Sequence, residues 1–484
     1  MRARLTRRLA TTAAALLAVL VPAAPMAVAQ PPSKPDGPAD SASGPTPPPL
    51  DGDRSVPGDN GLPDLPYTRK ANLACVQSIP SEVELQTIPW GQRVLQFDEL
   101  HKFATGRGQR IAVIDTGVNR HEYLGNRLSG GGDYVQGGGN GLDDCDGHGT
   151  QVAGIIAANP KDDSIGFKGI AYDAEIISIR QSSDYFEYQP PNQNDRNGRP
   201  KAGSVSTLAK AVVNAARKNV DVINMSIDNC RAATDPISGP ERDLQKALRF
   251  AVEDKDVVVV VSAGNTPSGA CKEQNSSDPE NPTYIVSPPW FSDYVISVAA
   301  VQPDGAVAEF SMHGPWVSVA APGVDIISLD PGDPTRLVDQ SATGGGELGP
   351  IVGTSFSAPY VAGLAALIRE RFEKLGKPLT ARQVMDRIKQ TASHPAAADG
   401  HDSKVGYGMI NPIGALTSKI PGQEGISADA PANVPFEMPP PHERDWGPEQ
   451  VAVIGSFGGL GLLLLTMFIV HTVRRQKRDR TGSA

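Results

Sequence analysis

The chain has 484 residues, with 45 Lys and Arg against 54 Asp and Glu, and therefore a formal net charge of −9. Hydrophobic residues make up 39% and charged residues 20% of the chain, which is the composition of a globular protein with a buried core. The mild acidity argues against a nucleic-acid partner, because such proteins usually carry a basic domain or stripe. Four cysteines are too few for a small disulfide scaffold, but they allow two disulfides in an exported protein.

The first 29 residues have the three parts of a secretory signal peptide. Four arginines in the first eight residues precede an uncharged run, 9–28, which is rich in Ala, Leu and Val. The run is followed by a small-x-small pattern, Ala27-Val28-Ala29, which is typical of a cleavage site. The sequence therefore predicts export of the chain. An uncleaved N-terminal anchor is the alternative interpretation.

Residues 451–470 form a stretch of 20 residues without a charge. As a helix rising about 1.5 Å per residue, this stretch would span about 30 Å, the thickness of the hydrocarbon core of a membrane. Basic residues follow between 474 and 480, and the positive-inside rule puts such a tail in the cytoplasm. We therefore expect a transmembrane helix over 449–473, a cytoplasmic tail over 474–484, and an extracytoplasmic remainder anchored to the cell membrane. The alternative is a buried core helix.

Two proline-rich stretches flank the middle of the chain, 30–66 and 421–448. They contain few large apolar residues, so they cannot bury enough surface to offset the entropy lost on ordering. The chain is thus expected to comprise an N-terminal extension over 30–87, a folded domain over 88–420, and a linker over 421–448 that leads to the membrane.

The folded domain shows alternating strand and helix patterns. Short β-rich runs bounded by Gly, Asp or Pro predict six strands: 110–114, 175–179, 220–226, 257–262, 295–299 and 317–320. Five consecutive valines, 257–261, are typical of a strand buried on both faces of a parallel sheet. Apolar stripes over 205–216, with Ser204 as the cap, and over 244–252 predict helices. This alternation indicates an α/β fold with a mostly parallel sheet.

Three motifs stand where chemistry gathers in such sheets, at the carboxyl ends of strands. Asp115 directly follows a strand, His148 opens a helical run, and Ser355 stands at the start of an apolar helix after Gly353. Taken singly, each has a plainer interpretation as a turn residue, a structural histidine and a helix cap. Ser357 is the alternative nucleophile, but it lies further into the helix.

Jointly, these motifs and their order resemble the subtilisin-like serine proteases (subtilases) over about 88–418. The resemblance implies a three-layer subtilisin-like fold and an acyl-enzyme mechanism. Ser355 would attack the peptide carbonyl, His148 would accept its proton, and Asp115 would orient the histidine. The run Ser262-Ala263-Gly264-Asn265 matches the oxyanion motif of the family. It implies that the Asn265 side chain and the backbone N–H of Ser355 stabilise the oxyanion.

Substrate binding is expected at Ser226 and Gly264. The run 222–226 resembles the subtilase strand that pairs with the peptide substrate, and Gly264 belongs to the oxyanion motif. The sequence departs from the family at Asp228, where a small residue is usual. Either this carboxylate narrows the first specificity pocket or it favours basic side chains. Three loops are long: 182–203, 266–283 and 330–350. They either set specificity or bind partners, or they are insertions that the surface tolerates.

The four cysteines allow three pairings. Cys230 and Cys271 each follow a predicted strand, Cys230 just past Ser226 and Cys271 just past Asn265, so parallel strands would bring them to one sheet edge. Cys145 lies three residues before His148 and is left with Cys75. We therefore predict the disulfides Cys75–Cys145 and Cys230–Cys271. The first would fasten the N-terminal extension beside the active site, so we expect an extension that wraps the protease and no independently folding prodomain.

The sequence predicts no cofactor and no metal site. Its main acidic run is Asp143-Asp144-Cys145-Asp146. Such a run is typical of a solvated turn, in which each carboxylate meets water.

The whole arrangement resembles the mycosins, the membrane-anchored subtilases of type VII secretion systems. This resemblance implies protein or peptide substrates and membrane components of a secretion complex as partners. Two hypotheses follow from it. In one, the chain is an active extracytoplasmic endopeptidase that processes secreted substrates. In the other, it mainly stabilises the secretion complex, and proteolysis is secondary.

Overall fold

The computed structural model describes residues 44–71, 73–76, 87–189, 200–276, 278–342, 348–397, 399–423 and 447–481. The expected signal peptide, 1–29, and most of the expected linker lie outside the described residues. The chain divides into two compact units, 1–420 and 421–484, which are treated separately below.

A seven-stranded parallel sheet forms the centre of the first unit, in the order β12-β11-β9-β7-β2-β4-β3. The six predicted strands are confirmed, with boundaries shifted by at most two residues: β2 (Arg110–Asp115), β4 (Glu175–Arg180), β7 (Val222–Met225), β9 (Val258–Ser262), β11 (Ile296–Val301) and β12 (Val317–Pro322). The edge strand β3 (Leu128–Asp133) was not predicted. Its sequence, LSGGGD, lacks the β-branched residues that mark the other strands.

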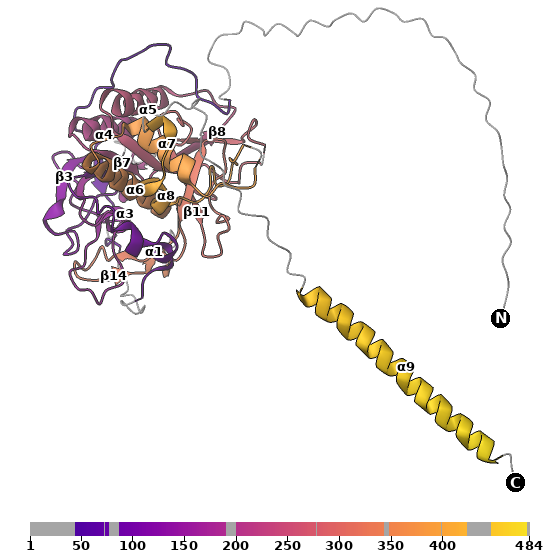
Figure 1. Cartoon of the computed structure of the whole chain (residues 1–484). Coiled ribbons are helices and arrows are strands. Elements are labelled where there is room, and N and C mark those ends of the chain that lie inside the picture. Colours follow the sequence, from indigo (N-terminus) through magenta and orange to yellow (C-terminus); the bar gives the residue numbers. More distant parts are fainter. Residues whose placement is uncertain are drawn as a thin grey trace, which may run out of the picture. The chain divides into compact units, whose positions relative to one another are not determined.

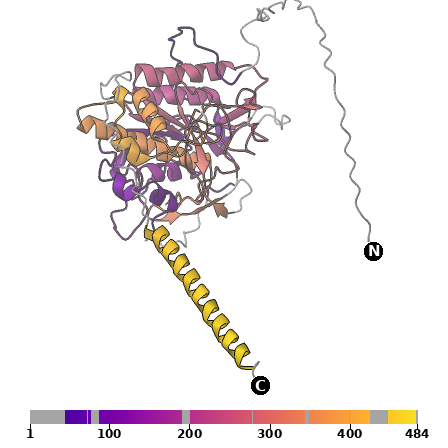
Figure 2. The same cartoon turned by 45° about the vertical axis from the view of Figure 1, so that its right-hand side comes forward.

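Helices flank the sheet and complete the three layers of a subtilisin-like fold (Figure 1). The helix α3 (His148–Ala157) packs on α6 (Thr354–Lys374), which also crosses β7, β9, β11 and β12. The helix α4 (Val205–Arg217) packs on α5 (Gly239–Arg249), and the two run side by side in Figure 2. A further helix, α7 (Ala381–Thr391), contacts α6.

Local signals in the sequence explain these elements. The five valines 257–261 are each at most 1% exposed, as expected for a central strand covered on both faces. Ser204 caps α4, because its side chain accepts a hydrogen bond from the backbone N–H of Thr207 while the Thr207 hydroxyl accepts one from the Ser204 N–H. This reciprocal pair satisfies two backbone donors that the first turn would otherwise leave unpaired.

The described part of the N-terminal extension packs against the folded domain. Its strand β1 (Tyr67–Arg69) pairs antiparallel with β5 (Ser183–Tyr188), which in turn pairs with β6 (Lys201–Ala202). Further towards the N-terminus, Asp53 forms an ion pair of 2.8 Å with Lys246 on α5. The extension therefore adds a strand to the fold and contacts two separate elements of the folded domain, β5 and α5.

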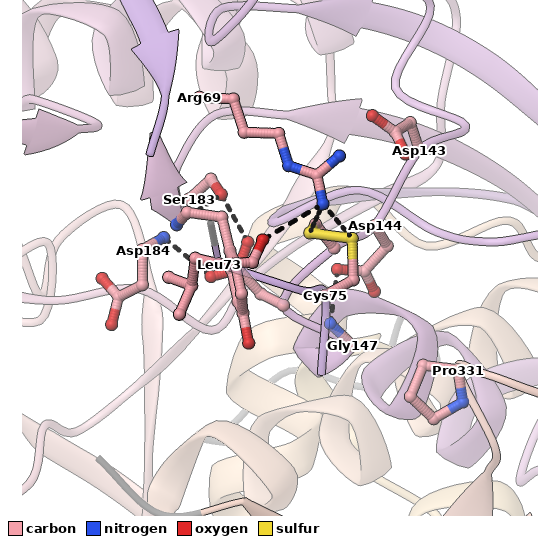
Figure 3. The surroundings of a disulfide bond; sticks show 12 residues. Arg69, Leu73, Cys75, Asp143, Asp144, Gly147, Ser183, Asp184 and Pro331 are labelled. Carbon is pink, nitrogen blue, oxygen red and sulfur yellow. Dashed lines mark hydrogen bonds between the residues drawn. A yellow bond between two sulfur atoms is a disulfide. The ribbon is translucent and has the colours of Figure 1, made fainter. Parts of the chain in front are cut away.

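Two disulfides are present, and both join the pairs that the sequence predicts, Cys75–Cys145 and Cys230–Cys271. The first connects the extension to the loop before α3 (Figure 3). Beside it, Nη2 of Arg69 lies 3.1 Å from Sγ of Cys75. The second leaves from β8 (Asn229–Ala232), which pairs antiparallel with β10 (Tyr284–Ser287).

The second unit contains one long helix, α9 (Gly447–Thr481). Its segment Ser456–Arg475 is long and apolar enough to cross a membrane, by length and composition. The predicted span, 449–473, lies within this helix. Large apolar side chains such as Phe457, Leu462 and Phe468 are exposed along it, by 72%, 71% and 66%.

Candidate active site

Asp115 and His148 meet at the carboxyl end of the central sheet. Asp115 is the last residue of β2 and is fully buried, whereas His148 begins α3 and has a side chain that is 29% exposed. Nδ1 of the histidine lies 2.7 Å from Oδ1 of the aspartate. Since a carboxylate accepts, Nδ1 carries the proton in this pair, and Nε2 is left as the proton acceptor.

Gly149 makes this close approach possible. A Cβ atom at Gly149 would lie 2.0 Å from the backbone oxygen of Gly117, which is far inside contact distance. Any side chain there would push α3 away from the loop that follows β2. The glycine after the histidine is therefore a steric requirement for the short bond between His148 and Asp115.

The electrostatic surroundings favour the cationic form of His148. Burial by itself lowers the pKa of the imidazole, but the carboxylates of Asp115, Asp144 and Asp146 outweigh it and leave the pKa above its usual value. A raised pKa means that the site stabilises an imidazolium, the form the ring takes after it has accepted a proton.

Ser355 lies in the first turn of α6, a helix of 21 residues. Its Oγ donates a 3.3 Å hydrogen bond to the backbone oxygen of Ser226, while Oγ of Ser226 donates a 2.7 Å bond to the backbone oxygen of Ser355. Within the described residues, no hydrogen bond joins Ser355 Oγ to His148. In enzymes without a bound substrate, hydrogen bonds between reacting groups are often long and tighten in the complex.

Ser357, the alternative nucleophile, is fully buried. A hydroxyl without solvent access cannot meet the carbonyl of a peptide that enters from the surface. Ser355 is only partly buried, so the geometry favours it over Ser357.

Asn265 follows β9 and faces the start of α6. Its side-chain oxygen accepts hydrogen bonds from the backbone N–H and from the hydroxyl of Thr354, at 3.0 and 3.1 Å. Because the oxygen is engaged in this way, the amide is fixed in one orientation, and the remaining polar atom, Nδ2, is a donor. Thr354 was missed by the sequence analysis, although it directly precedes the predicted nucleophile.

A cleft of about 450 Å³ opens over the Asp115–His148 pair. Ser226 is among its lining residues, whereas Gly264 is not. Two of the three long loops contribute to its lining, the first with residues 182–184 and the third with residues 341 and 350. These two loops therefore help to shape the cleft, whereas none of the described residues of 266–283 lines it.

Asp228 lies next to the oxyanion motif. Its carboxylate accepts the backbone N–H of Asn265, and its Oδ2 would be 3.5 Å from a Cβ atom placed on Gly264. Burial raises the pKa of this carboxyl to about 6. The side chain thus fills space beside Gly264.

The acidic run before His148 is not a solvated turn. Asp143 is exposed and pairs with Arg180, as a turn residue can. Asp144, in contrast, is 3% exposed and accepts several hydrogen bonds from protein groups. The prediction for this segment is wrong because charge alone says nothing about the donors that the fold brings to a carboxylate.

Comparison with known proteins gives consistent matches. The model of the subtilase family matches residues 106–408. Mycosin-1 of Mycobacterium tuberculosis is 42% identical over 417 residues, which cover 83% of this chain and 88% of that protein. The solved structure of the serine protease MycP1, described as an essential component of the type VII (ESX-1) secretion system, matches with a TM-score of 0.68 and 39% identity. This match covers 76% of the present chain and 98% of that structure.

A further match is a chain in the structure of an intact ESX-5 inner membrane complex. It is 36% identical, with a TM-score of 0.68, and the alignment covers 86% of the present chain and 98% of the other.

The histidine electrostatics give a first prediction. Replacing Asp115 by Asn should lower the pKa of His148, because the replacement removes the nearest anion that stabilises the imidazolium. An NMR titration of the histidine side chains in the exported part of the chain measures this. His121, whose pKa is lowered by burial away from this pair, serves as the internal control and should not shift. An unchanged His148 titration would contradict the electrostatic account.

Proposed function

Since this chain belongs to the subtilase family and, within it, to the mycosins, it is a serine endopeptidase, and we propose that Ser355, His148 and Asp115 form its catalytic triad. The observation that carries the proposal is the 2.7 Å bond between His148 and the buried Asp115, beneath a cleft beside the start of α6. The order of the three residues along the chain is that of subtilisin.

The proposed reaction proceeds by acyl transfer. Ser355 Oγ attacks the scissile carbonyl while Nε2 of His148 accepts its proton. Asp115 keeps the ring in the tautomer with the proton on Nδ1 and stabilises the imidazolium. The histidine then gives its proton to the leaving amine, and an acyl-enzyme remains. In the second half, His148 activates a water molecule that releases the acid product.

The oxyanion of each tetrahedral intermediate needs donors that are fixed before the reaction. We assign this role to Nδ2 of Asn265 and to the backbone N–H of Ser355. Thr354 supports the first donor, because its two hydrogen bonds hold the Asn265 oxygen and so fix the orientation of Nδ2. The second donor lies in the first turn of α6, where unpaired amides favour a negative charge.

The substrate is proposed to be a protein or peptide segment in extended conformation. It would pair with the backbone that follows β7 around Ser226, with Gly264 on the other side of the bound residue. Ser226 is a cleft residue and lies within bonding distance of the Ser355 backbone. Asp228 fills the space beside Gly264, which supports a narrowed first specificity pocket over one built for long basic side chains.

The proposed setting is the outer side of a cell membrane. The helix α9 would be the membrane anchor, with the basic tail in the cytoplasm and the protease domain outside. Two disulfides agree with an extracytoplasmic domain. From its likeness to MycP1 and to a chain of the ESX-5 inner membrane complex, we infer that it processes secreted substrates of a type VII system. We also infer that it supports the membrane complex of that system.

The triad gives the next prediction. A fluorophosphonate probe for serine hydrolases should label the exported part of the chain, residues 30 to about 425, and Ser355→Ala should abolish the labelling. Ser357→Ala is the matched control and should still be labelled, because Ser357 is buried. Labelling that survives in Ser355→Ala would overturn the proposed nucleophile.

The oxyanion assignment gives another prediction. Asn265→Ala should lower the turnover of a peptide substrate by about 10²–10³-fold with little change in KM, as loss of the equivalent donor does in subtilisin. Steady-state kinetics measure both constants. Asn281→Ala, which changes an exposed asparagine, should leave them unaltered. A rise in KM with unchanged turnover would speak against a role in the transition state, because it would show that Asn265 binds substrate and transition state equally.

The supporting role is tested separately from catalysis. The full chain with Ser355→Ala should co-purify with membrane secretion proteins as well as the unaltered chain does, since the substitution leaves the surface and α9 intact. A chain ending at residue 446, without α9, should be lost from the membrane fraction. Loss of partners in Ser355→Ala would show that assembly depends on proteolysis and would remove the structural role as an independent function.

A further inference from the structure

We propose that Asp144 is a positioning residue for the proposed catalytic pair: its buried carboxylate ties the segment that carries Asp115 to the segment that carries His148. The proposal rests on the proposed function, in which these two residues act together. It concerns a residue that contacts neither the substrate nor the reacting atoms.

The carboxylate of Asp144 accepts four hydrogen bonds, two on each oxygen. Oδ1 accepts the hydroxyl of Thr116 and the backbone N–H of Gly147, both at 2.8 Å. Oδ2 accepts the backbone N–H and the hydroxyl of Thr150, at 2.8 and 2.6 Å. With 3% of the residue exposed, Asp144 is held by protein donors instead of water. Figure 3 shows it beside Gly147 and the disulfide.

These donors come from both halves of the pair. Thr116 follows Asp115, and its backbone N–H donates a 2.7 Å bond to Oδ1 of Asp115, the same oxygen that His148 contacts. The Thr116 hydroxyl also accepts the N–H of Gly149 at 3.0 Å. Gly147 and Thr150 bracket His148 in the sequence. Asp144 therefore connects the end of β2 to the first turn of α3 on either side of the histidine.

The backbone of Asp144 is fixed as well. Its N–H donates to Oδ1 of Asn119 at 2.8 Å, and its carbonyl accepts from Nδ2 of the same asparagine at 2.9 Å. The next residue is Cys145, which is bonded to Cys75, and the N–H of Val76 donates to its carbonyl at 2.9 Å. The N-terminal extension thus fastens the residue adjacent to Asp144, and through it the segment before His148.

The charge of Asp144 also supports the pair, because it stabilises the imidazolium form of His148. Burial raises its pKa to about 6, and the bonds from Thr150 and Thr116 oppose that rise, so the carboxylate is ionised at neutral pH. Together with Asp115 and Asp146, it is one of the anions that raise the pKa of His148. The charge of His148 in turn lowers the pKa of Asp228. Removing one anion should leave the imidazolium less stable.

A purely structural role for Asp144 makes a different prediction. Loss of the carboxylate would then lower the stability of the fold, but it would change neither the reactivity of Ser355 in the folded protein nor the dependence of that reactivity on pH. The rate of fluorophosphonate labelling reports this reactivity directly and needs no known substrate.

The test compares Asp144→Asn with Asp143→Asn in the exported part of the chain. Asp143, the neighbouring residue, is 67% exposed and serves as the matched control. Labelling is measured against probe concentration and pH. For Asp144→Asn we expect the limiting rate to fall about 10²-fold, as a misplaced catalytic group can cause, with an unchanged half-saturating concentration. The acid limb of the pH profile should move to lower pH, because labelling needs neutral His148 and loss of the anion lowers its pKa.

An Asp144→Asn protein that folds with both disulfides and keeps the limiting rate and the acid limb of Asp143→Asn overturns the proposal. If Asp144→Asn does not fold, Thr150→Val and Thr150→Ser decide the question. The valine removes one donor to Asp144 and should slow labelling, and the serine, which keeps the hydroxyl, should restore it. Equal rates in both would also overturn the proposal. If the unaltered chain is not labelled at all, the proposed triad fails instead.

Discussion

The short contact between His148 and Asp115 is the constraint on which the site depends. The two residues belong to a helix and a strand, and the imidazole reaches the carboxylate only because α3 begins directly above the end of β2. Gly149 provides the space for this, since a Cβ atom there would collide with the backbone of Gly117. The parallel order of the sheet then brings the ends of β7 and β9, with Ser226 and Asn265, to the same edge.

Two buried carboxylates lie close together around this contact. Asp115 is fully buried, and Asp144 lies near enough for the charge of Asp115 to raise its pKa. Burying carboxylates is unfavourable unless hydrogen bonds replace the lost water. Asp144 meets this condition with four donors. Asp115 meets it in part, because within the described residues its Oδ2 has no hydrogen-bond partner while Oδ1 accepts from Thr116 and His148.

Much of this could be predicted from the sequence, for identifiable reasons. β-branched runs such as 257–261 mark buried strands, and the parallel strands explain why Cys230 and Cys271 meet. Glycine-rich β3 was missed because its pairing comes from the neighbouring β4 and not from its own residue preferences. The burial of Asp144 was missed for a similar reason. Its donors, such as Thr116, approach only after folding, so the local pattern indicates nothing but charge.

The N-terminal extension is best understood as part of the protease domain. Its strand β1 pairs with β5, whose first residues line the cleft, and its cysteine is bonded to the loop that precedes His148. A propeptide that inhibits by occupying the cleft must be able to leave. This extension would stay attached through Cys75 even if the chain were cut between 76 and 87. Both attachments join the extension to segments that contribute to the cleft lining, β5 and the loop before His148, so the extension is fastened to the same segments that shape the cleft.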